Sequence, residues 1–325
     1  MRKLVFAIAA GLLLAACAGP QQRPVPELMF RMRDYQEIQH SHNVQGCAVY
    51  GDLLFSMQDK GWCNVFDLKS SQLAAQFPLG SHGKQNHANV AFFGPQRYDA
   101  SDIFPLLYVS QCKSKPVTEI GLAETDSLSR LLFVERILTD DGGMPYGSEL
   151  VQIVSYEPKA WNSRLWIADA KNPDLIYCYG NTVGNEDPAN HIVVSTFRFP
   201  EFSADRFLVT LTDDDVLDSV NFDSLLPQGA RGPQNGILQG AAVIDGILFL
   251  PVGVGSVKHP SEVFYAGLRK HKGMYGHFDY TDILPWEPED FDIWGDKLIC
   301  PCNTDSAGVV YSFPYKELVR AMVKK

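Results

Sequence analysis

One strand–turn–strand pattern recurs in the chain and limits the folds that it can adopt. It is found in the stretches Gln45–Phe55, Gln239–Phe249 and Glu289–Ile299. Each copy has a short apolar run, a two-residue turn written Gly-Asp or Asp-Gly, and a second apolar run. Such turn pairs between apolar runs are typical of tight β-hairpins. A hairpin repeated at wide intervals predicts a repeat architecture built from β-sheets.

Strand candidates fill almost the whole chain from Glu27 to Pro314, and helical periodicity is nearly absent. The candidates fall into groups of four, and the second and third groups open at His87–Gly94 and Arg164–Asp169. Only Tyr315–Lys325 is expected to be helical. The expected strand 28–38 precedes the first group, which is 45–50, 52–57, 62–67 and 72–79. The second group is 87–93, 105–111, 130–138 and 148–156, and the third is 163–169, 175–180, 191–199 and 207–211 with a continuation near 216–222. The fourth group is 237–244, 247–252, 262–268 and 274–284, and the last is 289–294, 297–301 and 308–313.

Repeated four-stranded antiparallel sheets are typical of a β-propeller. We therefore predict an all-β fold, a five-bladed β-propeller, with six blades as the alternative. The long region between the second and fourth group openings has strands for two blades, and its excess length lies in Lys113–Ser129 and Pro227–Asn235. The last group has three strands of its own, so we predict that the N-terminal strand Leu28–Ile38 completes it and closes the ring.

The first residues predict export. Met1-Arg2-Lys3 is basic, and the apolar run Leu4–Leu13 is too short to span a bilayer but suits a signal peptide. Leu14-Ala15-Ala16-Cys17 resembles the lipobox of bacterial lipoproteins, which implies cleavage before Cys17 and its lipidation, for example with palmitate. The alternative is an ordinary secretory signal with a chance cysteine. Ala18, by the same resemblance, implies the outer membrane of a Gram-negative cell.

These features predict a signal peptide at 1–16, a lipidated proline-rich tether at 17–26 and a single β-propeller domain at 27–325. The chain has 28 basic and 38 acidic residues, a formal charge of -10, which argues against a nucleic-acid partner. Six cysteines follow Cys17; five of them lie in apolar strand patterns, which favours free buried thiols, although a Cys47–Cys63 disulfide stays possible. No cofactor fingerprint or metal-ligand spacing is present in the sequence, so we expect neither.

A resemblance supports the fold. The runs Phe104–Ser110, Phe197–Pro200 and Val209–Ser219, together with Gln239-Gly240, resemble uncharacterised β-propeller lipoproteins of Bacteroidetes-type gut bacteria. The likeness extends over most of the mature chain, and its motifs are structural. It implies a propeller fold and a cell type, and it implies no activity.

In a propeller, the first strand of each blade lines the central channel, and the polar residues at the starts of these strands would meet at one mouth. They would either bind a ligand, such as a glycan or a cell-wall fragment, or satisfy strand-end amides and ordered water. We take them as the candidate ligand-binding site. These residues are Gln45, Asn86, His87, Asn89, Gln239, Glu287, Glu289 and Asp290.

Enzyme activity stays uncertain at this stage. A glycan-active hydrolase or lyase would need two facing carboxylates, and Glu287, Glu289, Asp290 and Asp169 are eligible, with His87 assisting. Asp213–Asp215 fits a turn cap better than a calcium loop. A third reading is a scaffold for another envelope protein. Four aromatic residues would stack on sugars or brace the packing between blades, namely Trp62, Trp161, Trp286 and Tyr275.

The lipid anchor is directly testable. Cys17→Ser removes the thiol that would carry the lipid, so the expected result is an unprocessed precursor that no longer partitions with membranes. Fractionation of cells and the mass of the protein measure both effects. Unchanged processing and membrane attachment in the variant would contradict the lipoprotein interpretation.

Overall fold

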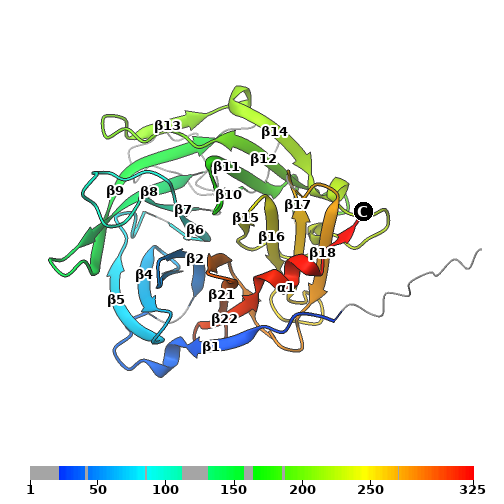
Figure 1. The fold of residues 1–325 in the computed structure, drawn as a ribbon, viewed down its shortest axis with the longest axis horizontal. Helices are drawn as coiled ribbons and strands as arrows, with labels where there is room; N and C mark the ends of the chain where they lie inside the picture. Colours follow the sequence, from blue (N-terminus) through cyan, green and yellow to red (C-terminus); the bar gives the residue numbers. More distant parts are fainter. Residues whose placement is uncertain are drawn as a thin grey trace, which may run out of the picture.

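The computed structural model describes residues 22–40, 43–84, 86–111, 131–156, 164–184, 187–269 and 271–325. The expected signal peptide, Cys17, the insertion Lys113–Ser129, Cys112 and Trp161 lie outside these residues. Within them the fold is all-β with one short helix, and the strands are arranged around a common centre as in a β-propeller (Figure 1). The predicted all-β, propeller-like class is therefore confirmed.

The first two groups of strands follow each other along the chain. The first group is β2 (Val44–Tyr50), β3 (Leu53–Gln58), β4 (Trp62–Asp67) and β5 (Gln72–Pro78), paired in that order. The second group is β6 (Val90–Phe93), β7 (Leu107–Ser110), β8 (Leu132–Thr139) and β9 (Pro145–Tyr156). β13 (Leu208–Leu211) extends the second group, parallel to β9.

The third and fourth groups share one continuous sheet. The third is β10 (Leu165–Asp169), β11 (Asn172–Asn181), β12 (Ile192–Arg198) and β14 (Val216–Asn221). The fourth is β15 (Ala242–Ile244), β16 (Ile247–Val252), β17 (Glu262–Gly267) and β18 (Met274–Asp279), with β23 (Val323–Lys324) beside β18. The two groups join where β10 meets β15 in parallel, at Asp169 and Val243.

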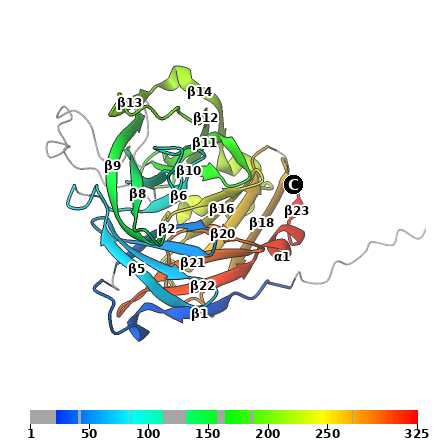
Figure 2. The ribbon, with the colours of Figure 1, turned by 60° about the vertical axis from the view of Figure 1, so that its left-hand side comes forward.

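The last group combines both ends of the chain. β19 (Glu287–Pro288) and β20 (Asp292–Trp294) both pair with β21 (Lys297–Asn303), which pairs with β22 (Val309–Pro314). β1 (Glu27–Arg31) pairs antiparallel with the outer side of β22. In Figures 1 and 2, β1 lies beside β22, near the other end of the chain. The predicted pairing of the N-terminal strand with the last group is therefore present.

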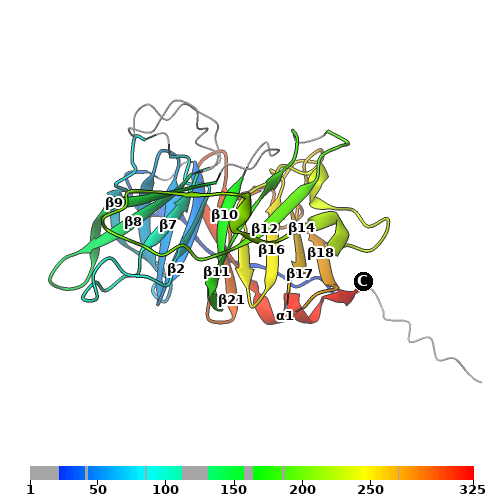
Figure 3. The ribbon, with the colours of Figure 1, turned by 90° about the horizontal axis from the view of Figure 1, so that it is seen from above.

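Helix α1 (Tyr315–Arg320) follows β22 directly. Figure 3 shows the molecule from its edge, with most strands running across its thickness and α1 near one face. The helix is shorter than expected. Its chain continues as β23, because residues past the helix reach the free edge of β18, where Met274 pairs with Lys324.

The recurring hairpin folds as the sequence predicts. Its three copies close with the pairs Tyr50–Leu53, Ile244–Ile247 and Trp294–Lys297, each around a two-residue turn. In the Asp-Gly copy both turn residues have positive φ, 53° and 74°, as a type I′ turn requires. In the Gly-Asp copies only the glycine does, with φ of 60° and 58°, as in a type II′ turn. The order of the two residues therefore selects the turn type.

The strand predicted at 207–211 was assigned to the wrong group. It is β13, and it pairs with β9 of the second group, while β14 supplies the fourth strand of the third group. Alternation alone identifies a strand but not its partner, because pairing is decided by tertiary contacts. The first strand also ends earlier than expected, at Arg31, and a 3-10 turn follows at Met32–Asp34.

Apolar side chains fill the spaces between adjacent groups. Tyr156 of the second group packs edge-on against Phe197 of the third, with ring centroids 4.9 Å apart. The five cysteines within the described residues are free and buried, so Cys47 and Cys63 form no disulfide. Asp213–Asp215 form a 3-10 turn with a Thr212–Asp215 capping box, as expected for a turn cap.

Glycines let the inner strands approach one another closely. A Cβ on Gly46 would lie 2.7 Å from the carbonyl carbon of Val90 and 2.8 Å from the amide nitrogen of Ala91. A Cβ on Gly240 would lie 2.5 Å from the carbonyl oxygen of Glu289. Both contacts involve backbone atoms, which cannot rotate away as a side chain can. The centre of the fold therefore requires glycine at these positions.

We expect Gly46→Ala to lower the free energy of unfolding by about 2–3 kcal/mol, because the added methyl group overpacks a backbone contact. Gly147→Ala is the matched control. Its Cβ would meet only the Leu138 side chain, at 3.8 Å, and it should change stability by less than about 1 kcal/mol. Urea unfolding measures both variants. Equal stability of the two would contradict the close approach of β2 and β6.

Candidate functional site

The eight residues expected at the channel mouth divide by exposure. Two of them, His87 and Glu287, are partly exposed. The other six are buried, with at most 6% of their surface exposed: Gln45, Asn86, Asn89, Gln239, Glu289 and Asp290. The start of the inner strands is therefore filled by polar side chains, and access from solvent is concentrated at two points.

Asp290 ties the inner strands together. Its Oδ2 accepts the backbone N–H groups of Cys47, at 2.9 Å, and Ala91, at 3.2 Å. Its Oδ1 lies beside Gly240 and has no hydrogen-bond partner within the described residues. Burial raises the pKa of Asp290 well above its usual range, while the backbone donors act in the opposite direction. This carboxyl group joins the first, second and last groups and has a structural role.

Glu287 is the accessible carboxylate of a small network. Its Oε1 accepts from Gln239 Nε2 at 2.7 Å, and its Oε2 accepts from Asn303 Nδ2 at 3.4 Å. The buried Glu289 carboxyl group lies near the Glu287 carboxylate, close enough to be affected by its charge. Burial, followed by the negative charge of Glu287, raises the pKa of Glu289 well above its usual range. The protonated form of Glu289 is therefore favoured.

Two acceptors of this network lack a donor. Glu289 Oε1 and Asn303 Oδ1 are buried and have no hydrogen-bond partner in the part of the chain that the structure describes. Buried polar atoms are nearly always paired, so an unpaired one calls for a water, an ion or a ligand group. The network is thus rich in acceptors and poor in donors.

His87 belongs to a second, separate network. Its Nδ1 lies 2.7 Å from Asp59 Oδ1, and its backbone N–H donates to Gln111 Oε1 at 3.1 Å. Asn86 beside it is structural: Nδ2 donates to Ser81, and Oδ1 accepts from the Ala88 backbone. Asp59 thus fixes the orientation of the His87 ring.

The backbone connects the two networks. Gly46 N donates to the carbonyl of Ala88, which follows His87 in the chain. The next residue, Cys47, donates its N–H to Asp290, which follows Glu289, so β2 lies between the two networks. Within the described residues no hydrogen bond joins His87 directly to the Glu287 network. The structure therefore brings the predicted residues to one end of the inner strands, but as two groups and not as one.

An axial cavity of about 190 Å³ lies next to the predicted residues, farther along the same strands. None of the eight predicted residues lines it. Its walls are mostly small and apolar, so it offers few polar contacts to a ligand. Every group of strands contributes to its lining, which places it on the axis: Val49, Ala91, Phe92, Phe93, Ile167, Ala168, Ala170, Ala241, Ala242, Val243, Phe291, Asp292 and Ile293.

Asp292 is the polar residue of this cavity, and the sequence reasoning did not single it out. Its Oδ2 accepts from Val49 N at 2.6 Å, and its Oδ1 accepts from Ile293 N at 2.7 Å. Burial raises the pKa of Asp292 to about 7 in spite of these donors. The signal available in the sequence was its alternation with Asp290 across one apolar residue, Phe291.

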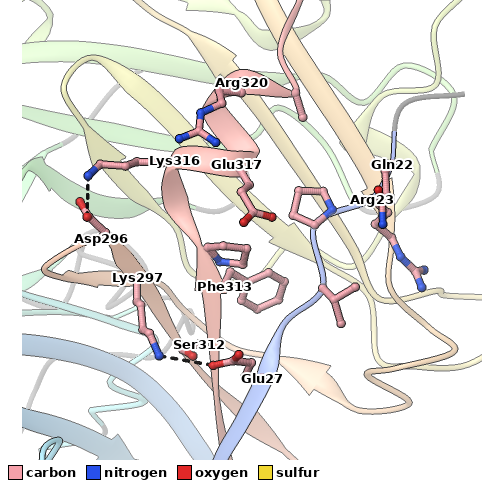
Figure 4. A pocket seen from close by; sticks show the side chains of 14 residues that line it. Gln22, Arg23, Glu27, Asp296, Lys297, Ser312, Phe313, Lys316, Glu317 and Arg320 are labelled. Atoms are coloured by element: carbon pink, nitrogen blue, oxygen red, sulfur yellow. Dashed lines mark hydrogen bonds and ion pairs between the residues drawn. The ribbon is translucent and has the colours of Figure 1, made fainter. Parts of the chain in front are cut away.

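A larger cavity lies elsewhere. About 750 Å³ in volume, it lies between the N-terminal segment and α1 (Figure 4). Its charges are largely paired: Lys316 with Asp296 at 2.6 Å, and Lys297 with Glu27 at 3.4 Å. None of the eight predicted residues lines it.

The eligible carboxylates do not form an open facing pair. Asp169 accepts hydrogen bonds from the backbone N–H groups of Lys171, Asp245 and Gly246, so its carboxylate has a structural role. Glu289 is buried while Glu287 is partly exposed, so these two carboxyl groups do not face each other across one open pocket, as those of a glycosidase must. In the described ranges no cluster of three His, Cys, Asp or Glu residues is arranged to hold a metal ion.

Comparisons with known proteins define the fold and no more. No family model and no curated protein matches the chain. A tail fiber of Staphylococcus aureus phage P68 is similar in structure, with a TM-score of 0.51 and 13% identity. The match covers 91% of this chain but only 56% of the tail fiber. The β-propeller domain of Cps50 (Swd1) from Myceliophteria thermophila aligns over 85% of this chain and 84% of its own, with a TM-score of 0.37 and 10% identity, too low to support an argument. No helix within the described ranges is long and apolar enough to cross a bilayer.

Stability should fall as pH rises toward neutrality. The folded protein holds the Asp292 proton up to about pH 7, whereas the unfolded chain releases it near pH 4, so rising pH favours unfolding across this window. Asp292→Asn should flatten that slope in urea unfolding measured from pH 4 to pH 8. The exposed Asp296→Asn is the control and should keep the wild-type slope. A slope in Asp292→Asn equal to that of the wild type would refute the raised pKa of Asp292.

Proposed function

We propose that the chain is a five-bladed β-propeller held at the cell envelope by a lipid on Cys17, and that it binds a glycan or cell-wall fragment at one end of its central channel. Five inner strands line the axial cavity, which supports the blade count. The β1–β22 pairing supports closure of the ring by the N-terminal strand. Because β1 covers the outer edge of β22, the N-terminal and C-terminal parts of the chain are held in one sheet, which suits a rigid binding module.

The observation that carries the proposal is the acceptor-rich network around Glu287. The partly exposed Glu287 lies beside Glu289 Oε1 and Asn303 Oδ1, which lack donors within the described residues. Sugar hydroxyl groups, or the amines of a cell-wall fragment, are donors of the kind that this network accepts. A ligand that donates hydrogen bonds to these atoms would pair buried acceptors, which increases its binding affinity relative to a ligand without such donors.

The His87 network adds a second contact region. Asp59 and Trp62 bracket the turn between β3 and β4, so the His87–Asp59 pair and the Trp62 ring lie near each other. Trp62 is partly exposed, and the His40 ring packs against it with centroids 4.3 Å apart. Aromatic faces of this kind stack on the apolar faces of sugar rings.

A glycan-active hydrolase or lyase remains the alternative. One observation favours it: the Glu287–Glu289 pair combines a carboxylate with a neighbouring carboxyl group that keeps its proton, which is the division of roles that general acid–base catalysis needs. The nearly complete burial of Glu289 argues against direct contact with a substrate. Binding without chemistry is therefore the function that the geometry supports best. A scaffold for another envelope protein is the third candidate.

A glycan-array screen tests the proposal. Glu287→Gln replaces the central acceptor with a group that also donates, and binding of any positive glycan should weaken about tenfold. His87→Ala should weaken it less, because His87 lies in the second network. Glu201→Gln, at an exposed position remote from these networks, is the matched control.

The outcomes separate the candidates. Glycan binding by both Glu287→Gln and His87→Ala with the affinity of the wild type would contradict the channel-mouth site. Release of shortened glycans by the wild type, lost in Glu287→Gln, would establish the hydrolase or lyase instead. Binding of an envelope protein with no glycan response would favour the scaffold.

A further inference from the structure

A second polar cavity opens where the third and fourth groups meet, at the ends of the inner strands opposite to the Glu287 network. Its volume is about 430 Å³, large enough for a monosaccharide. The third group supplies Tyr177 and Arg198, and the fourth supplies Asp245, Gly246 and Arg269. Residues from two groups thus form one concave surface.

The position of the cavity is fixed by Asp169. Its carboxylate accepts from the N–H groups of Asp245 and Gly246 at 2.9 and 2.8 Å, so the turn of the fourth group is tied to the end of β10. Lys171 N also donates to it, at 2.9 Å. With three backbone donors, this carboxylate is held at the junction of the two groups and is not free to turn toward a ligand.

Two guanidinium groups face this surface without a partner. Among the described residues, neither the Arg198 nor the Arg269 side chain makes an ion pair or a hydrogen bond, and both are exposed to solvent. Elsewhere, arginines such as Arg136 are paired, with Nη2 at 2.7 Å from Asp102. Two unpaired guanidinium groups at one cavity are suited to bind a carboxylate.

Tyr177 is the buried polar group of the cavity. The side chain is fully buried, yet its hydroxyl has no hydrogen-bond partner within the described part of the chain. Burial, together with the charge of Asp169, raises the pKa of Tyr177 to about 12, while Arg269 acts in the opposite direction. The phenol is therefore neutral, close to Arg269, and available as a donor to an oxygen atom.

The remaining lining supplies acceptors and an apolar wall. The exposed Asp174 carboxylate has no hydrogen-bond or ion-pair partner among the described residues and can accept hydrogen bonds from hydroxyl groups, as can the amide oxygen of Asn172. Leu175 and Leu217 provide apolar surface. A ligand matching this lining has one carboxylate, several hydroxyl groups and an apolar ring face.

We propose that this cavity binds a sugar acid, with its carboxylate at Arg198 and Arg269 and its hydroxyl groups at Asp174 and the Tyr177 hydroxyl. The Asp245 carboxylate, 3.7 Å from His271 Nε2, lies at the rim. This site shares no residue with the Glu287 network, so its existence does not depend on the function proposed for that network.

Calorimetric titration of the full-length protein with glucuronate tests the proposal. Glucose lacks the carboxylate and acetate lacks the hydroxyl groups, so both should bind at least about tenfold more weakly than glucuronate. Arg198→Gln and Arg269→Gln should each weaken glucuronate binding about tenfold, and added salt should weaken it in the wild type. Arg206→Gln, at an exposed arginine outside the cavity, should leave it unchanged.

Tyr177→Phe gives an independent readout. Removal of a buried hydroxyl without a partner should leave the melting temperature unchanged or raise it, whereas glucuronate binding should weaken. A purely structural tyrosine would instead lose stability without a change in binding. The proposal is overturned if glucuronate gives no signal at millimolar concentration, if it binds no better than acetate, or if both arginine variants bind it as the wild type does.

Discussion

The buried carboxyl group of Asp290 is the interaction on which the centre of the molecule depends. It accepts backbone N–H groups from β2 and β6 and lies against Gly240 of the fourth group. Inner strands that converge on one axis present N–H groups that cannot all pair with a neighbouring strand, and an unpaired buried donor is costly. A carboxyl group near the axis satisfies two of them. The approach is possible only because Gly46 and Gly240 carry no side chain.

The same device is repeated between other groups. Asp169 accepts from the Asp245–Gly246 turn, and Glu135 accepts from Gly80 and Ser81 at 3.0 and 2.9 Å. Acidic residues are thus used as internal acceptors for backbone amides, which explains why Asp290, Asp169 and Glu135 are buried. Most of the polar residues near the axis therefore serve the fold, and the few that remain accessible gain significance for binding.

The two candidate sites differ in chemistry because the hydrogen bonds of the fold leave different polar groups unpaired at each. Around Glu287 the framework leaves acceptors without donors, which suits hydroxyl or amine donors. At the opposite ends of the strands it leaves two guanidinium groups and the Tyr177 hydroxyl without acceptors, which suits an anion. A rigid set of sheets can hold both sets of groups in place without a ligand, so that binding needs little reorganisation.

The sequence by itself determined the hairpins, the order of the strands and the turn cap at Asp213–Asp215, which follow from the local signals of alternation and turn residues. The pairing of the N-terminal strand with the last group followed instead from a count of strands over the whole chain, which left that group one strand short. Only the tertiary structure decided that β13 joins the second group, that Glu289 and Asp290 are buried while Glu287 is accessible, and that Asp292, Arg198 and Arg269 line cavities. Strand pairing and burial depend on which surfaces meet across the ring, and no short stretch of sequence contains that information.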